Sequence, residues 1–269
     1  MEKFIPHPEY AIDPSQLKEE DAIILVDKPA GISSFGVVAK VRGALKQKFG
    51  HKVKIGHTGT LDPFATGLLI LLSGKMTKKS SDFLKLDKVY EATLRLGYTS
   101  TTGDPEGEIT EYPQKTEFMF DGKTQQYPSE GPSERGSARM SADRPWRRAG
   151  RTQPELDIVE PTLQSFIGTI TQAPPKFSAI KINGQRAYQL ARKGESFEIP
   201  SRQVEIYSIE ILDYNYPKLT IRVHCSSGTY IRTLAEDIGK ALNTGAYLIS
   251  LRRTKIGNFD VKNAIINLC

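Results

Sequence analysis

Cysteine is scarce in this sequence, and no group of residues has the spacing of a metal site. Cys225 and Cys269 are the two cysteines, and neither belongs to a C-x-x-C pair. The four histidines also lack the spacing of metal ligands. These absences exclude a disulfide framework and a zinc site as the basis of the fold, and they favour a reduced chain without a bound metal.

Long apolar runs are absent as well. Apolar residues follow one another for at most five positions, as from Leu68 to Leu72, whereas a membrane-spanning helix needs about 20 such residues. The polar N-terminus has no apolar signal segment. We therefore expect a soluble protein of the cytoplasm.

Basic residues are present in modest excess. The 37 lysines and arginines outnumber the 31 acidic residues, which gives the 269-residue chain a net charge of +6. Such an excess points toward a nucleic-acid partner, although many other soluble proteins share it. The length suits one large domain or two small ones, and the 38% of hydrophobic residues can support a core.

Apolar patterns predict strands and helices in mixed order. Strands are expected at residues 23–26, 68–72, 89–96, 177–182, 204–212, 219–224 and 247–256. Ser33 or Ser34 should cap a helix that buries Phe35, Val38, Val41 and Leu45, and Thr229 should cap another helix over residues 229–242. Because no regular strand–helix–strand rhythm is present, an α+β fold with a mixed sheet is favoured over a doubly wound one.

One long stretch lacks the composition of a packed core. Residues 110–155 contain no valine, isoleucine or leucine, and six arginines lie between Arg135 and Arg151. Such a segment buries too little apolar surface to offset the entropy of ordering it. We expect a flexible insertion over residues 111–155, which either adds contacts to RNA or is a solvated loop without a specific role.

A glycine-rich loop at residues 56–67 contains the first candidate catalytic residue. Three glycines in twelve residues allow tight turns and the close approach of a ligand. Asp62 lies between Leu61 and Pro63, and a carboxylate in such an apolar loop can act as a nucleophile or a base. The alternative is an aspartate that caps a turn, as aspartate before proline often does.

A second candidate lies at the start of the predicted helix 229–242. Gly228 allows a sharp turn into this helix, and Arg232 falls in its first turn. A cation gains nothing from the helix dipole at this end. Arg232 therefore indicates a partner outside the helix, either a carboxylate or a phosphate, and the alternative is an ordinary solvated arginine.

Basic and aromatic residues alternate between residues 176 and 193. Lys176, Lys181 and Arg186 lie in this segment, with Gly184 and Gly194 as hinges. This pattern is typical of an element that follows an RNA backbone, and the alternative is a charged surface helix.

Six stretches of the sequence occur in a characteristic order. They are residues 26–34, 56–67, 88–90, 175–181, 225–232 and 251–253. Together they resemble the motifs of the TruB family of tRNA pseudouridine synthases, and the resemblance covers about residues 21–110 and 156–260. It implies the pseudouridine synthase core, which is a mixed, mainly antiparallel sheet with flanking helices and a central RNA-binding cleft.

The resemblance also implies roles for individual residues. Asp62 would be the essential aspartate, and Arg232 would pair with it. Tyr90 would stack on the target base and is a candidate for removing the C5 proton. His57 would lie beside the flipped nucleotide, and Leu251 would pack against the site.

The implied reaction isomerises uridine to pseudouridine, at uridine 55 in the T-loop of tRNA. It involves no redox change and therefore requires no cofactor. Asp62 would either attack C1′ of the ribose or remove a proton from C2′, and the sequence leaves both open. Other possibilities are the same reaction on another RNA and a chaperone that folds tRNA without turnover. A nucleoside hydrolase has no motif support.

The resemblance also sets an expected organisation. We expect one catalytic domain over residues 1–269, with its core at about residues 21–260 and without the C-terminal PUA domain that bacterial members often have. The insertion at residues 111–155 is longer than is usual in the family. We expect a monomer that binds the T-arm of tRNA and depends strongly on the segment 176–193 for affinity.

Overall fold

The computed structural model describes most of the chain outside the predicted insertion. It describes residue 17 and residues 19–112, 153–178, 180–182 and 184–264, and it gives the backbone of two short strands, β7 (Glu117–Phe120) and β8 (Lys123–Gln126). Most of the insertion expected over residues 111–155 lies outside these residues. In the part that is described, no helix has the length and apolar character needed to cross a bilayer.

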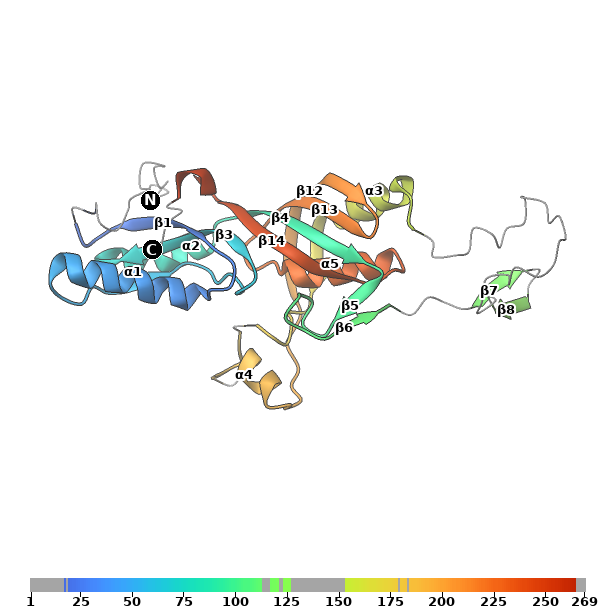
Figure 1. Ribbon diagram of the computed structural model, residues 1–269, viewed down its shortest axis with the longest axis horizontal. Helices are drawn as coiled ribbons and strands as arrows, with labels where there is room; N and C mark the ends of the chain where they lie inside the picture. Colours follow the sequence, from blue (N-terminus) through green and yellow to red (C-terminus); the bar gives the residue numbers. More distant parts are fainter. Residues whose placement is uncertain are drawn as a thin grey trace, which may run out of the picture.

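One mixed sheet of nine strands runs through the described residues (Figure 1). Its main path follows the order β1 (Ile23–Lys28), β3 (Thr66–Ser73), β14 (Ala246–Ile256), β4 (Lys88–Leu96), β13 (Lys218–Cys225), β12 (Arg202–Asn215) and β9 (Gly168–Gln172). β2 (Ile55–His57) pairs with β3, and β15 (Phe259–Asp260) pairs with β14. All these pairs are antiparallel except β14 with β3. The predicted α+β fold with a mixed, mainly antiparallel sheet is confirmed.

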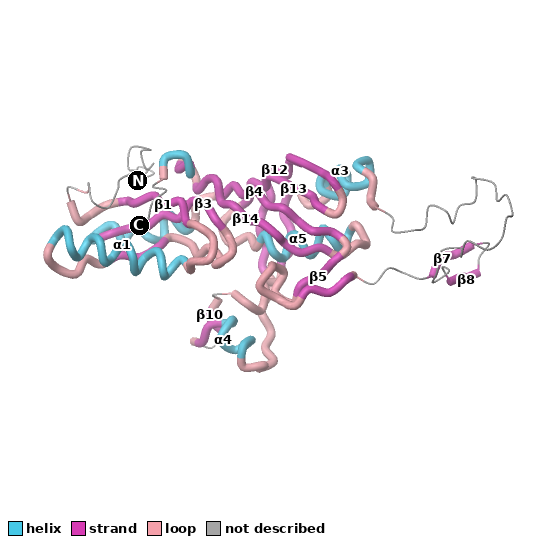
Figure 2. The backbone as a smooth tube through the Cα atoms, viewed as in Figure 1, coloured by secondary structure: helices cyan, strands magenta, loops and turns pink. Residues whose placement is uncertain are grey.

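Helices flank this sheet, and two small hairpins project from it. The helices are α1 (Ser34–Phe49), α2 (Ser80–Leu84), α3 (Leu156–Gln164), α4 (Ala187–Arg192) and α5 (Ile231–Ala241), with 3₁₀ turns η1 (Gly74–Lys79) and η3 (Val261–Asn263). The hairpins are β5 (Tyr98–Ser100) with β6 (Ile109–Glu111), and β10 (Lys181–Ile182) with β11 (Gln185–Arg186). Figure 2 shows α4 and β10 standing away from the sheet, whereas α1 and α5 lie along it.

The two halves of the sheet differ in how many faces they bury. Seven of the eight residues of β3 are buried, because α1 covers one face and Phe83 and Phe259 cover the other. The burial of β4 alternates along the strand, because α5 packs on only one of its faces. A strand buried on both faces has a continuous apolar sequence, whereas a strand buried on one face alternates. The site described below lies where these halves meet.

Parallel pairing joins the two halves at one short contact between β3 and β14. Arg252 and Arg253 of β14 pair with Thr66 and Gly67, at the start of β3. Gly67 has a φ of 101°, and a Cβ there would lie 2.3 Å from the Arg253 carbonyl oxygen. Only glycine permits this approach. The loop before β3, which contains Asp62, is thereby fixed against β14.

Several predicted helix features are confirmed. Ser33 is the N-cap of α1, and its side chain accepts a hydrogen bond from the amide of Gly36. The apolar face predicted for the later helix is buried in the core, and it comprises Ile231, Leu234, Ile238 and Leu242.

Three predictions about local structure are wrong. Phe35 is 66% exposed, and Val37 is buried instead, because the two residues lie on opposite edges of the face formed by Val38, Val41 and Leu45. Tyr230, not Thr229, is the N-cap of α5, and the Thr229 hydroxyl donates to the Ser226 carbonyl instead.

The third correction concerns the strand predicted at residues 177–182. Among the described residues of this stretch, Lys181–Ile182 alone have strand geometry. The Phe177 carbonyl accepts a hydrogen bond from the Arg232 guanidinium at 2.9 Å. The Phe177 carbonyl therefore bonds a side chain of the site instead of a neighbouring strand.

Candidate active site

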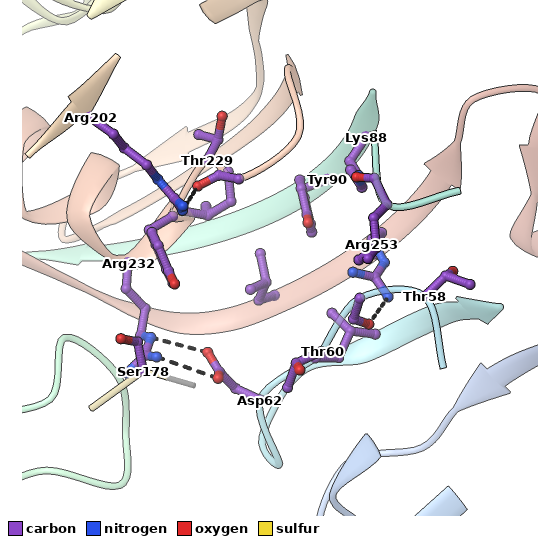
Figure 3. Close-up of a pocket in the computed structure, with 17 residues that line it drawn as sticks. Thr58, Thr60, Asp62, Lys88, Tyr90, Ser178, Arg202, Thr229, Arg232 and Arg253 are labelled. Atoms are coloured by element: carbon purple, nitrogen blue, oxygen red, sulfur yellow. Dashed lines mark hydrogen bonds and ion pairs between the residues drawn. The ribbon is translucent and has the colours of Figure 1, made fainter. Parts of the chain in front are cut away.

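A pocket of about 300 Å³ lies at the junction of the two halves of the sheet. Figure 3 shows its walls, which come from the loop around Asp62, from β4 and β14, and from the start of α5. Ser178 and Arg202 close the side next to α5. Residues far apart in the sequence therefore converge on one cavity.

The loop that contains Asp62 is held in place by the turn before α1. The buried Ser34 hydroxyl donates to the Leu61 carbonyl at 2.9 Å and accepts from the Leu61 amide at 2.8 Å. The Gly31 amide donates to the Pro63 carbonyl at 2.8 Å, and the Lys28 ammonium donates to the same carbonyl at 3.1 Å. Backbone groups on both sides of Asp62 are thus hydrogen-bonded, which fixes the carboxylate in the pocket.

Asp62 forms a two-point ion pair with Arg232. Arg232 Nε lies 3.0 Å from Asp62 Oδ2, and Arg232 Nη2 lies 3.4 Å from Oδ1 (Figure 3). The Arg232 side chain is 5% exposed, and that of Asp62 is 31% exposed on the pocket side. The outside partner predicted for Arg232 is therefore confirmed, and it is a carboxylate.

The remaining donors of Arg232 are also occupied. Its Nη1 donates to Asp104 Oδ2 at 3.1 Å and to the Thr102 carbonyl at 3.0 Å, and its Nη2 donates to the Phe177 carbonyl at 2.9 Å. Asp104 is only 4% exposed. A guanidinium held by two carboxylates and two carbonyls cannot change its orientation, so it presents a fixed edge to Asp62.

Burial and neighbouring charges act in opposite directions on Asp62. Burial raises the pKa of the Asp62 carboxyl above its usual value, the Arg232 guanidinium lowers it, and the Asp104 carboxylate raises it. Arg232 is therefore needed to keep Asp62 ionised. Because Arg232 is shared with Asp104, the Asp62 carboxylate is more basic than it would be if Arg232 paired with Asp62 alone.

Asp104 was not recognised as a site residue from the sequence, although it shares a local sequence feature with Asp62. Both aspartates precede proline. The Asp104 carboxylate accepts from the Thr102 hydroxyl at 2.6 Å and from the Glu106 amide at 3.0 Å, so it caps a turn as aspartate before proline often does. Its contact with Arg232 joins residues 128 positions apart, which local sequence cannot reveal.

Tyr90 and Leu251 form the apolar wall of the pocket. Tyr90 is 8% exposed on β4, and Leu251 is 6% exposed on β14. Arg253 also lines the pocket, and it donates from Nε to the Leu68 carbonyl at 2.8 Å and from Nη2 to the Gly59 carbonyl at 3.2 Å. Burial raises the pKa of Tyr90, and the Arg253 guanidinium beside it opposes that rise. Arg253 was not recognised as a site residue from its sequence.

The other predicted binding residues lie outside the lining of this pocket. His57 is half-buried at the end of β2, where burial, Arg253 and Arg186 lower its pKa. Lys176 and Arg186 are exposed, and Lys181 pairs with Arg186 in the β10–β11 hairpin. The three basic residues therefore belong to the projecting segment that contains α4 in Figure 2.

Two buried lysines add positive charge beside the pocket. Burial lowers the pKa of Lys28 to about 8 and that of Lys88 to about 8. Lys28 is held by the carbonyls of Pro29 and Ile32 at 2.8 Å each. Lys88 lines the pocket and donates to the Leu84 carbonyl at 2.8 Å. These ammonium groups hold the loops around the pocket and make it attractive to an anionic ligand.

The arrangement provides one ionisable carboxylate in a pocket otherwise rich in cations and lined by a tyrosine ring. Within the described ranges, no cluster of three or more histidine, cysteine or acidic side chains has the geometry of a metal site. The carboxylate can act as a nucleophile or a base, and the aromatic wall can hold a planar base.

The clamp between Ser34 and Leu61 leads to a testable prediction. We expect Ser34→Ala to slow turnover about tenfold or more and to lower the stability by about 2 kcal/mol, because two buried backbone groups lose their partner. Ser33→Ala is the matched control, since it removes the α1 cap and costs about 1 kcal/mol but leaves the Asp62 loop clamped. Denaturant unfolding and single-turnover rates measure both effects. Equal turnover in the two variants would contradict a role for the clamp.

Comparison with known proteins identifies the family of this chain. Residues 46–142 and 133–231 match the profile of the TruB family pseudouridylate synthase N-terminal domain, and residues 232–268 match the tRNA pseudouridylate synthase B C-terminal domain. The tRNA pseudouridine synthase B of Phocaeicola vulgatus is 41% identical over 248 residues, which are 92% of this chain and 90% of that protein. The chain belongs to the TruB family. The tRNA pseudouridine synthase B of Flavobacterium johnsoniae is 43% identical over 248 residues, covering 91% of this TruB family chain and 93% of that protein.

Solved structures share the fold of this TruB family member. A Cbf5–Nop10–Gar1 complex matches with a TM-score of 0.58 and 25% identity, over 94% of this chain and 55% of that chain. An H/ACA RNP bound to a substrate RNA containing 2′-deoxyuridine matches with a TM-score of 0.57 and 23% identity, over 97% of this chain and 57% of that chain. The chain thus spans little more than half the length of these structural relatives. The family resemblance and the pseudouridine synthase core predicted from the sequence are confirmed.

Proposed function

We propose that this protein isomerises uridine to pseudouridine in tRNA, with Asp62 as the catalytic carboxylate. The observation that carries the proposal is the Asp62–Arg232 ion pair in a pocket walled by Tyr90 and Leu251. Membership of the TruB family and relatives named tRNA pseudouridine synthase B support the reaction and the substrate.

The pocket chemistry suits the bonds that this reaction changes. The N1–C1′ bond of uridine breaks, the uracil turns, and a C5–C1′ bond forms while C5 loses a proton and N1 gains one. Asp62 faces the ribose and either attacks C1′ or removes the C2′ proton, and Arg232 keeps it ionised and oriented. The reaction is an isomerisation, so its atoms and electrons balance without a cofactor.

The target base must leave the RNA stack to reach Asp62. Flipping costs a few kcal/mol, which stacking on Tyr90 and contacts to the backbone offset. Leu251 completes the apolar wall against the base, and His57 lies beside the pocket. Lys176, Lys181 and Arg186 lie on the projecting α4 segment and contact the RNA outside the pocket.

Uridine 55 in the T-arm of tRNA is the proposed target position. Within this proposal the protein is a cytoplasmic monomer, and its chain is a single catalytic domain. The test incubates the purified protein with unmodified tRNA and maps pseudouridine by carbodiimide modification and primer extension. A stop at position 55 supports the proposal, a stop elsewhere moves the target, and the absence of any stop refutes the enzymatic function.

The hydroxyl of Tyr90 should contribute more to turnover than to RNA binding. We expect Tyr90→Phe to keep RNA affinity within about threefold, because the ring that stacks on the base remains. Turnover should fall about 10²-fold, because a hydroxyl that lines the pocket is lost near the atom that must release a proton. Filter binding and single-turnover rates separate the two effects.

Tyr247 provides the matched control for this substitution. It is a buried tyrosine whose hydroxyl accepts a hydrogen bond from Arg95 at 3.4 Å, and it does not line the pocket. Tyr247→Phe should therefore leave both affinity and turnover unchanged. Normal turnover of Tyr90→Phe would limit Tyr90 to stacking.

A further inference from the structure

Arg202 lines the pocket from the side of β12, and the sequence motifs gave it no role. Its guanidinium carbon lies 4.8 Å from the centre of the Tyr230 ring, and its Nη2 donates to the Gly228 carbonyl. A Cβ on Gly228 would lie 3.2 Å from that guanidinium carbon. Arg202 is therefore wedged between the turn before α5 and an aromatic ring, which fixes its planar head at the pocket wall.

No carboxylate neutralises Arg202 within the described residues. Four other arginines around the site have acidic or multiple carbonyl partners: Arg232 has Asp62 and Asp104, Arg222 has Glu91 and Glu210, Arg252 has Asp27, and Arg253 has two carbonyls. Arg202 bonds one carbonyl with one of its five N–H donors. A fixed cation with unused donors at a pocket wall is suited to bind an anionic partner from outside the chain.

Unsatisfied buried atoms point to the same place. In the described part of the chain, two buried side-chain nitrogen or oxygen atoms have no hydrogen-bond partner, and they are Arg202 Nε and Ser178 Oγ. Both residues line the pocket. A buried polar atom without a partner costs about 1–3 kcal/mol, so such atoms are rare in native proteins. Their coincidence in one pocket indicates that a polar ligand completes the site.

We propose that Arg202 binds a backbone phosphate of the flipped nucleotide. The proposal rests on the proposed function, since it names the ligand of a residue in the same pocket. Figure 3 shows Arg202, Asp62 and Tyr90 at three separate places around the pocket. A nucleotide whose ribose faces Asp62 and whose base faces Tyr90 can direct a flanking phosphate toward Arg202. A planar guanidinium matches two phosphate oxygens with paired donors.

The decisive experiment removes the phosphate charge from the RNA and leaves the protein intact. Stem–loop RNAs of the T-arm are made with a methylphosphonate on the 5′ or the 3′ side of the target uridine, and binding to the wild-type protein is measured. We expect a loss of about tenfold in affinity at one of the two positions. No loss at either position overturns the proposal.

A substitution then assigns that loss to Arg202. We expect Arg202→Gln to weaken binding of the unmodified stem–loop about tenfold, and to lower the slope of log K against log salt by about one. The methylphosphonate that weakens the wild type should cost this variant less than about twofold. An equal loss in both proteins means that another group holds the phosphate and overturns the assignment.

Arg222→Gln is the matched control. Arg222 lies on β13, is paired with Glu91 and Glu210, and does not line the pocket. Its affinity, salt slope and methylphosphonate response should equal those of the wild type.

Pseudouridine formation by the wild type on the unmodified stem–loop is measured in the same series. If the wild type forms pseudouridine but neither methylphosphonate weakens binding, only the proposed role of Arg202 is refuted. If the wild type forms no pseudouridine, the proposed function is refuted.

Discussion

Asp62→Asn should abolish pseudouridine formation, with a loss of at least about 10³-fold in the single-turnover rate. Asparagine has nearly the same shape as aspartate but can neither attack C1′ nor accept the C2′ proton. Its uncharged amide also forms a weaker interaction with the Arg232 guanidinium. Carbodiimide mapping of unmodified tRNA measures the loss.

Binding and folding should survive this substitution. The backbone groups on either side of Asp62 are held by Ser34, Gly31 and Lys28, and none of these bonds uses the carboxylate. RNA affinity should therefore stay within about threefold of the wild type, because the carboxylate repels phosphate and contributes no attraction to the backbone. A large loss of affinity would show that Asp62 organises the pocket and does not act on the substrate alone.

Asp82→Asn serves as the control for Asp62→Asn. Asp82 lies exposed on α2, outside the pocket lining. Its conversion to asparagine makes the same change in charge but should leave turnover unchanged. A comparable loss in both variants would assign the effect to net charge, and full activity of Asp62→Asn would refute its catalytic role.

The features of the fold that could be predicted are those determined within a single strand or along one face of a single helix. The apolar runs of β1 and β3 and the stripe of α5 were correctly expected, because continuous burial and helical period are visible in sequence. Phe35 was misplaced because it lies at one edge of the face formed by Val38, Val41 and Leu45, and sequence alone does not show which edge is buried. The residues near Phe177 were assigned to a strand from their local pattern, but the Phe177 carbonyl bonds Arg232, which is distant in sequence.

The same distinction separates the site residues that were found from those that were missed. Asp62 and Arg232 lie in dense local motifs, and the misfit of Arg232 with its helix end correctly indicated an outside partner. Asp104, Arg253 and Arg202 each follow a less distinctive local pattern, and their relation to the pocket arises only from the packing of β4, β14 and β12. Local sequence can identify a residue that is able to act as an acid, base or ion-pair partner, whereas the tertiary fold determines which residues it contacts.

Arg232→Met should reduce both turnover and stability, and its loss of stability should exceed that caused by removal of either carboxylate partner. It leaves Asp104 buried without its cation and Asp62 without its clamp. Breaking a buried ion pair by removal of one partner costs about 3–5 kcal/mol. Turnover should fall at least about 10²-fold, because the carboxylate loses both its orientation and the charge that keeps it ionised. Denaturant unfolding and single-turnover rates measure the two losses.

The stability loss of Arg232→Met should shrink as the pH falls. Burial already raises the pKa of Asp62, and removal of the opposing Arg232 charge raises it further. A carboxyl with a raised pKa in the folded state is neutral at low pH and destabilises the fold as the pH rises through that pKa. The difference in stability between variant and wild type should therefore be larger at neutral than at acidic pH. A difference that is independent of pH would show that lost packing, not unpaired charge, causes the defect.

A second substitution should restore part of the stability but none of the activity. In the double variant Arg232→Met with Asp104→Asn, the buried negative charge that lost its partner is removed, and the amide oxygen of the new side chain can still accept from the Thr102 hydroxyl and the Glu106 amide. We expect recovery of about 1–2 kcal/mol relative to Arg232→Met, since the penalty for an unpaired buried charge is relieved. Turnover should remain as low as in the single variant, because Asp62 still lacks its guanidinium partner. Recovery of turnover would mean that Arg232 serves only to neutralise Asp104, and it would remove the ion pair with Asp62 from the mechanism.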